Sequence, residues 1–246
     1  MLEEVEGIVI RESSYQETSK LVGILTKEYG FLSVLAKGAK SLKSDLRNVT
    51  TKLTYGTFYL YYKENKLSTL ASADITSYFK HLKTDISSIS YASYLLELAE
   101  QVMKQNPDPK IFDLLIATLE KMEEGLDPFL LTNILELKYL DFLGVMPVLD
   151  GCSVCGRKTG IVTLSSSKGG YLCRECFQNE RIVSEKAIKL IRMFYYVEIP
   201  KITKLDVNRK VSHEINTFLE EYYDRYTGLY LKSKAFLKNL NKIAES

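Results

Sequence analysis

Four cysteines, all within one short segment, are the residues of this sequence whose type and spacing are most specific for chemistry. They form two Cys-x-x-Cys pairs, Cys152/Cys155 and Cys173/Cys176, separated by seventeen residues. Each pair can direct two thiolates at one ion, and two pairs supply the four tetrahedral ligands that Zn²⁺ prefers. Gly156 follows the first pair, where a chain reversal favours a residue without a Cβ. The spacing therefore predicts one bound zinc ion with these four cysteines as its ligands.

Three alternatives to zinc are four free cysteines in a core, a redox dithiol, and another metal centre such as an iron–sulfur cluster. A redox Cys-x-x-Cys is expected at a strand-to-helix junction of a thioredoxin-like unit, and no such unit is recognisable. A catalytic zinc keeps an open position and usually has histidine or carboxylate ligands, whereas four thiolates close the shell. We therefore expect a structural zinc, whose binding supplies much of the folding free energy of a module too small to bury a core of its own.

No catalytic centre is recognisable elsewhere in the sequence. The two histidines, His81 and His213, lie in no catalytic context. The motifs of a phosphate-binding loop, a dinucleotide site, a zinc protease and a nucleophile elbow are all missing. The cysteine pairs also lack the His-x-Glu partner of a zinc deaminase. The sequence predicts a protein without enzymatic activity.

A second candidate site is a basic stretch at residues 37–48 that also contains glycine and serine. It carries four cations against one acid, Asp45. Such cations neutralise phosphates, and serine hydroxyls can hydrogen-bond to phosphate oxygens. The alternative is a solvated turn, but we favour DNA binding and expect two further cations to extend the patch. The six expected DNA-binding residues are Lys37, Lys40, Lys43, Arg47, Arg11 and Lys20.

Aromatic side chains cluster shortly after this stretch, at Tyr55, Phe58, Tyr59, Tyr61 and Tyr62. Those on one face of a β-strand could stack on the bases of a single DNA strand, as aromatic side chains do in single-strand-binding proteins. The alternative, which we favour, is that they fill a barrel and cover its outer face.

The first eighty residues have the composition and partial period-two alternation of β-strands. Strands are expected at Val5–Arg11, Lys20–Thr26, Phe31–Lys37, Lys52–Tyr62 and Lys66–Ile75. Turns or loops are expected at residues 12–18, 29–30, 38–50 and 63–65. Five strands with short connections predict a small closed or nearly closed barrel, since closure protects the strand edges.

The pattern changes to helical after His81. Apolar residues at helical spacing predict helices near residues 89–103, 111–122, 129–143, 184–196, 207–222 and 233–243. Asp127-Pro128 is typical of an N-cap followed by proline at the first helical position. The expected division is a barrel at 1–81, a helical bundle at 82–150 and 182–246, and the cysteine module at 151–181.

Charge is distributed unevenly along the 246 residues. Residues 82–150 carry 5 basic and 12 acidic side chains, whereas residues 151–246 carry 17 and 10. This asymmetry fits a polyanion-binding protein, although solvated surfaces alone also produce such splits. The acidic N-terminus is unlike a signal peptide, and no apolar run reaches the ~18 residues of a membrane span. We expect a cytoplasmic protein with reduced thiols.

Several short stretches form an ordered pattern over nearly the whole chain. Near the N-terminus these are Glu6-Gly7-Ile8-Val9-Ile10-Arg11 with Tyr15, Glu17 and Leu21, Leu25-Thr26 with Gly30, and Ala36-Lys37-Gly38-Ala39-Lys40 with Ser44. In the middle they are Glu136-Leu137-Lys138, Leu143-Gly144, Pro147, Cys152, Cys155-Gly156, Gly169-Gly170-Tyr171-Leu172-Cys173 and Cys176. Near the end they are Leu231-Lys232-Ser233 and Phe236-Leu237. In order and spacing this pattern resembles the RecO family of bacterial recombinational-repair proteins.

The resemblance implies an α+β fold: an N-terminal five-stranded OB-fold β-barrel followed by a helical bundle with an inserted four-cysteine zinc module. It implies binding to single- and double-stranded DNA and annealing of complementary strands in the RecF pathway. It also implies action with RecR on DNA coated with single-strand binding protein, so that RecA can load. Some members of the family lack the four cysteines, which favours a structural zinc. Two alternatives remain: a zinc-ribbon scaffold that binds proteins, and an enzyme such as a nuclease.

Overall fold

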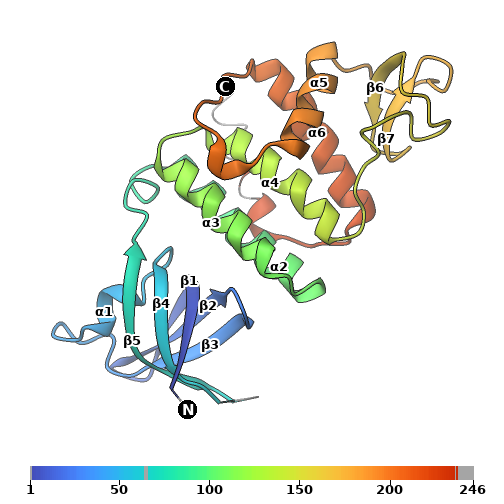
Figure 1. Ribbon diagram of the computed structural model, residues 1–246. Helices are drawn as coiled ribbons and strands as arrows, with labels where there is room; N and C mark the ends of the chain where they lie inside the picture. Colours follow the sequence, from blue (N-terminus) through green and yellow to red (C-terminus); the bar gives the residue numbers. More distant parts are fainter. Residues whose placement is uncertain (1, 64–65, 236, 238–246) are drawn as a thin grey trace. The chain divides into compact units, whose positions relative to one another are not determined.

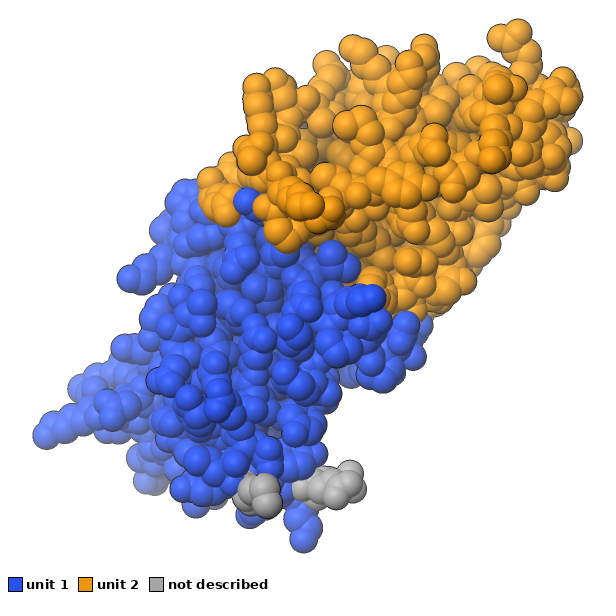
Figure 2. Space-filling model, viewed as in Figure 1, with its two compact units in different colours: residues 1–123, 233–246 blue, residues 124–232 orange. Residues whose placement is uncertain are grey.

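The structure is a computed structural model that describes residues 2–63, 66–235 and 237. The chain divides into two compact units, shown in blue and orange in Figure 2. Unit 1 comprises residues 1–123 and 233–246, and unit 2 comprises residues 124–232. The division into four segments expected from the sequence stays a prediction.

Unit 1 begins with five strands that form a closed barrel in the order β1-β2-β3-β5-β4 (Figure 1). Their bounds are β1 (Leu2–Tyr15), β2 (Ser19–Thr26), β3 (Gly30–Ala36), β4 (Tyr55–Tyr61) and β5 (Ser68–Ser77). All neighbouring strands are antiparallel except β3 and β5, which pair in parallel at Val34↔Ser68 and Leu35↔Thr69. This small five-stranded barrel is the OB-fold, so the expected fold class is confirmed.

Alternate apolar residues of the strands fill the barrel, as the period of two requires. The interior cluster consists of Val5, Val9, Val22, Ile24, Val34, Ala36, Ala39, Phe58, Leu60 and Leu70. β4 and β5 approach so closely at Gly56 that an added Cβ would lie 2.2 Å from the carbonyl oxygen of Asp74. Glycine at position 56 is therefore part of how the barrel closes.

Several strand boundaries differ from the prediction, and two of these differences have a clear physical cause. The turn expected at residues 12–18 was partly wrong, because β1 continues through Tyr15 and pairs with Ser19 of β2. Its last five residues are exposed, so they lack the apolar alternation that indicates a strand. β4 begins at Tyr55 rather than Lys52, because Leu53 has a φ of +64°, which is not strand geometry.

Unit 1 continues with three helices: α1 (Leu46–Val49), α2 (Ile86–Gln105) and α3 (Pro109–Glu123). The one-turn helix α1 lies within the loop expected at residues 38–50. The Asp85 carboxylate caps α2 by accepting a hydrogen bond from the Ser88 amide. α2 packs against α3 and against strands β1 and β3, so it connects the barrel to the helical part of the unit.

Unit 2 has three helices, α4 (Pro128–Phe142), α5 (Glu185–Tyr196) and α6 (Arg209–Tyr226), and a 3-10 turn at Ile199–Lys201. Asp127 accepts a hydrogen bond from the Phe129 amide and Pro128 is the first residue of α4, as predicted. Each pair of these helices is in contact. Between α4 and α5 the chain forms the hairpin β6 (Ile161–Ser165) and β7 (Gly170–Cys173), and the four cysteines lie before it, at its last residue and after it.

Of the helix expected at residues 233–243, residues 233–235 and 237 are helical; Phe236 and residues 238–243 lie outside the described residues. None of the helices in the described ranges has the length and apolar character needed to cross a membrane.

Candidate metal centre and nucleic-acid interface

The four cysteines predicted as ligands come together at one point. Their Sγ atoms all lie within 4.8 Å of one another, and those of Cys155 and Cys173 are 3.6 Å apart. Four sulfurs at ~2.3 Å from a tetrahedral ion are about 3.8 Å apart. The cluster therefore has the donor set and the spacing of a closed four-thiolate site that could hold a metal ion.

Two tight turns position the thiols. In the first, the Gly156 amide donates to the Cys152 carbonyl at 2.8 Å, and Gly156 has a φ of +74°. In the second, which follows β7, the amides of Cys176 and Phe177 both donate to the Cys173 carbonyl. Leu172 packs against the buried cysteines, so the cluster and the hairpin share one small core.

The electrostatics of the cluster favour the thiolate at its buried end. Burial raises the pKa of the Cys152 thiol, but hydrogen bonds from backbone groups of the two turns outweigh it and lower the pKa to about 6. Cys152 and Cys173 are buried, whereas Cys155 is exposed. Just outside the cluster, Arg157 pairs with Glu175. Neither histidine belongs to the cluster: His81 lies before α2, and the ring of His213 contacts that of Phe129 in a tilted arrangement with 5.0 Å between ring centres.

The four cations of the loop after β3 are all exposed. In the part of the chain that the structure describes, none of them has a carboxylate within ion-pair distance. They are Lys37, Lys40, Lys43 and Arg47. The loop begins at a fixed point, because Ala39 is buried in the barrel core and the Lys40 amide donates to Thr18 at 2.8 Å.

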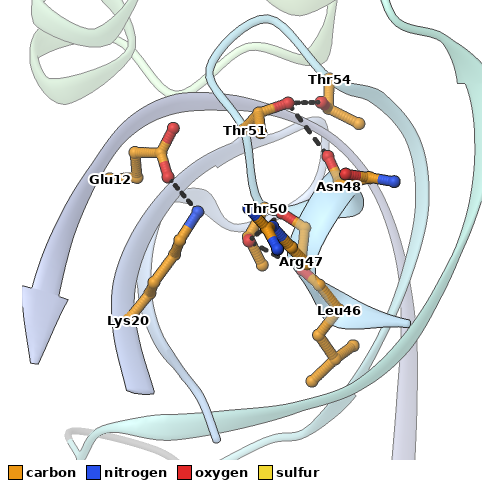
Figure 3. A network of polar contacts seen from close by, with 8 residues as sticks. All are labelled: Glu12, Lys20, Leu46, Arg47, Asn48, Thr50, Thr51 and Thr54. Atoms are coloured by element: carbon orange, nitrogen blue, oxygen red, sulfur yellow. Dashed lines mark hydrogen bonds and ion pairs between the residues drawn. The ribbon is translucent and has the colours of Figure 1, made fainter. Parts of the chain in front are cut away.

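The far end of this loop is held by α1 and a set of threonine hydroxyls (Figure 3). Leu46 and Val49 pack against the barrel core, which leaves Arg47 on the outer side of the turn. Thr50 donates to the Leu46 carbonyl at 2.7 Å, and Thr51 donates to the Asn48 carbonyl at 3.0 Å. The loop therefore presents its cations on an anchored backbone.

Arg11 and Lys20 differ from the loop cations because each has a carboxylate partner. Arg11 donates to both carboxylate oxygens of Glu100 on α2, at 2.8 and 3.3 Å, and its guanidinium carbon lies 4.1 Å from the ring centre of Phe31. Lys20 pairs with Glu12 (Figure 3), with 2.5 Å between Lys20 Nζ and Glu12 Oε2.

The aromatic residues of β4 divide by face. Phe58 fills the barrel, as the favoured interpretation predicted. Tyr55 hydrogen-bonds to Glu6, and burial with that bond raises the pKa of Tyr55 well above its ordinary value. Tyr59 hydrogen-bonds to Asp74 at 3.0 Å. Tyr61, in contrast, is 55% exposed.

The structure adds a group that the sequence reasoning missed. Tyr78, Lys80 and Lys83, in the connection between β5 and α2, line a pocket together with Asn48 and Thr51. The signal was the alternation of aromatic and basic residues in the sequence Tyr-Phe-Lys-His-Leu-Lys at 78–83.

Comparison with known families accounts for almost the whole chain. Residues 1–79 match the family described as Recombination protein O N terminal, and residues 83–235 match Recombination protein O C terminal. The chain belongs to the RecO family. It is similar to the DNA repair protein RecO of Listeria monocytogenes, with 36% identity over 98% of this chain and 96% of the relative. It is also similar to that of Bacillus cytotoxicus, with 39% identity over 98% of this chain and 99% of the relative.

The RecO assignment agrees with the OB-fold barrel and with the predicted family, and it places the chain among proteins of DNA repair and recombination. The four cysteines of this RecO chain are compatible with a bound zinc ion.

Proposed function

We propose that this chain is a recombination mediator without catalytic activity. It binds single- and double-stranded DNA, anneals complementary strands, and acts with RecR to help load RecA onto DNA coated with single-strand binding protein. The single observation that carries the proposal is the anchored loop on the OB-fold barrel, with four exposed cations that have no carboxylate partner among the described residues.

The chemistry of annealing explains why such a loop is useful. Two complementary strands repel each other until their phosphates are neutralised, and lysine and arginine contacts do this by releasing counterions. A backbone fixed by Ala39 at one end and α1 at the other keeps the cations close together. Contacts to phosphate carry no sequence information, so the loop accepts strands of any sequence.

We place the phosphate contacts on Lys37, Lys40, Lys43 and Arg47 first. Arg11 and Lys20 remain in the proposed patch at its edge, since each would have to exchange a carboxylate for a phosphate. The alternative to this placement is that DNA binds to the basic segment 151–246, which carries 17 basic and 10 acidic side chains.

We further propose that Cys152, Cys155, Cys173 and Cys176 hold one structural zinc ion. Four sulfurs at near-tetrahedral spacing support this, because thiolates are the ligands of closed zinc sites. When bound, the ion would cross-link the two turns and so add to the small core formed by Cys152, Leu172 and Cys173. Its site is separate from the barrel loop in sequence and in unit, so the DNA contacts do not depend on it directly. Action in the cytoplasm, on the nucleoid, belongs to the same proposal.

The test is annealing of complementary strands coated with single-strand binding protein, measured with and without RecR. Acceleration by the protein, increased by RecR, is the expected result. A zinc-ribbon scaffold that binds only proteins would show no salt-dependent affinity for naked DNA. A nuclease would cleave the strands in the presence of divalent metal, and cleavage that a point substitution abolishes would overturn the proposal.

A further inference from the structure

An open pocket of about 360 Å³ lies beside the basic loop, within unit 1. One wall comes from α1 and the turn after it, and the other comes from the connection between β5 and α2. Its lining residues are Asn48, Thr51, Tyr78, Lys80 and Lys83.

The wall made by the β5–α2 connection is held in one conformation. Phe79 is buried and has a φ of +45°, which a bulky residue adopts only where its surroundings enforce it. Its ring stacks on Tyr55, with 6.4 Å between ring centres. The amides of His81 and Leu82 both donate to the Glu123 carboxylate at 2.9 Å. These contacts fix the backbone from which Lys80 and Lys83 extend.

The opposite wall offers one free amide group. The Thr51 hydroxyl is engaged by the Asn48 carbonyl and by Thr54, each at 3.0 Å. The Asn48 side chain points away from this network (Figure 3), and it has no hydrogen-bond partner among the described residues. An amide can both donate and accept, so it suits a base edge or a phosphate oxygen.

The pocket is cationic and carries an unpartnered ring. Lys80 is exposed and Lys83 is half-buried, and in the described ranges neither has a carboxylate within ion-pair distance. Burial lowers the pKa of Lys83, because its ammonium loses hydration and the more distant carboxylates of Glu12 and Glu123 offset only part of that loss. The half-buried ring of Tyr78 makes no ring contact within the described part of the chain.

We propose that this pocket is a nucleotide subsite for a single strand that also crosses the basic loop. A backbone phosphate lies between Lys80 and Lys83, the attached base stacks on Tyr78, and the Asn48 amide contacts the base edge or the phosphate. Arg47 adjoins Asn48 in α1, so the loop and the pocket form one continuous path. The base must be unpaired to reach the ring, so the subsite distinguishes single-stranded from double-stranded DNA. This inference rests on the proposed DNA-binding function.

The experiment compares full-length variants in anisotropy titrations with oligothymidylate and with duplex DNA over a salt series. Substituting Lys80→Met with Lys83→Met keeps the aliphatic stems and removes both charges. The loss of one neutralised phosphate lowers the single-strand salt slope by about 0.7, so raising the salt from about 50 to about 200 mM weakens binding of the variant roughly 2.6-fold less than binding of the wild type. The matched control, Lys110→Ala with Lys186→Ala, removes the same charge from exposed positions elsewhere.

Two experiments test the role of Tyr78: substitutions test whether its ring stacks on a base, and photocrosslinking tests whether it contacts the strand. Tyr78→Leu should weaken single-strand binding by about tenfold, as loss of one base–aromatic stack does, while Tyr78→Phe and the affinity for duplex stay near wild type. An oligonucleotide with 5-iodouracil should photocrosslink to Tyr78, which mass spectrometry of the peptide identifies. Thermal unfolding of each variant verifies that it is folded.

The outcomes separate this inference from the proposed function. If the Lys80/Lys83 variant binds as wild type while substitution of the four loop cations weakens binding, the pocket is not a subsite and the loop stands. If the pocket variant alone loses affinity, the loop assignment fails and the subsite stands. An equal loss in the matched control, or no crosslink at Tyr78, overturns the subsite.

Discussion

The basic loop gives the sharpest quantitative prediction. Replacing its four cations by alanine removes four proposed phosphate contacts, each worth about 0.7 in the slope of log affinity against log salt for a single strand. The slope should therefore fall by about 2.8. When the salt is raised from about 50 to about 200 mM, the affinity of the wild-type protein should fall by a factor on the order of 50 times larger than the affinity of the variant. Binding should weaken alike for all sequences, because phosphate contacts do not read bases.

The same variant should fold normally. The four side chains are exposed and have no ion-pair partner among the described residues, so their loss should change the free energy of unfolding by less than about 0.5 kcal/mol. The matched control removes four exposed lysines from unit 2: Lys186, Lys189, Lys201 and Lys204. Salt-titrated anisotropy with oligothymidylate measures both. A loop variant that keeps its slope while the control loses it would refute the barrel site and place the DNA on unit 2.

Three further predictions concern stability and metal content. Protein purified without chelator should contain close to one zinc per chain by elemental analysis, and Cys173→Ser should lose the metal and lower the thermal stability of unit 2; a metal-free, fully folded wild type would contradict this. Arg11→Ala should lower the free energy of unfolding by about 1–2 kcal/mol. The substitution removes two hydrogen bonds to the buried Glu100 carboxylate, and the effect stays small because the Arg11 side chain is half exposed. As a control, Lys189→Ala removes an exposed ion pair with Glu185, which should cost less than about 0.5 kcal/mol in urea unfolding. If the Arg11 and Lys189 substitutions lower the free energy of unfolding equally, the Arg11 contact is not structural. Gly56→Ala should destabilise the barrel by about 1–3 kcal/mol in the same assay, because its Cβ would collide with the Asp74 carbonyl; a neutral result would mean that β4 and β5 can separate without cost.

The sequence was informative where a local pattern has a local cause. The strands at the barrel core follow from alternation, as Phe58 and Leu60 show, and the start of α4 follows from Asp127-Pro128. Two Cys-x-x-Cys pairs were sufficient to predict a four-sulfur cluster, since each pair folds back on its own turn. The polar end of β1 was missed because exposed strand residues carry no apolar period.

Contacts between distant segments could not be predicted in this way. Arg11 was expected to extend the basic patch, and nothing in the sequence indicated that it also has a carboxylate partner. Its partner Glu100 is 89 residues away, and only the packing of α2 on the barrel brings the two together. The pocket at Lys83 has the same origin: its walls come from α1 and from the β5–α2 connection, which are adjacent in space and separated in sequence.

The most direct test of the central claim is the rate of annealing of complementary strands coated with single-strand binding protein, followed by fluorescence energy transfer between labelled ends. The wild-type protein should accelerate annealing, RecR should increase the effect, and the four-cation loop variant should lose most of it while the unit 2 control keeps it. If wild-type protein and the loop variant anneal coated strands at the same rate, the barrel loop is not the annealing surface. If neither accelerates annealing with RecR present, the chain is not a recombination mediator.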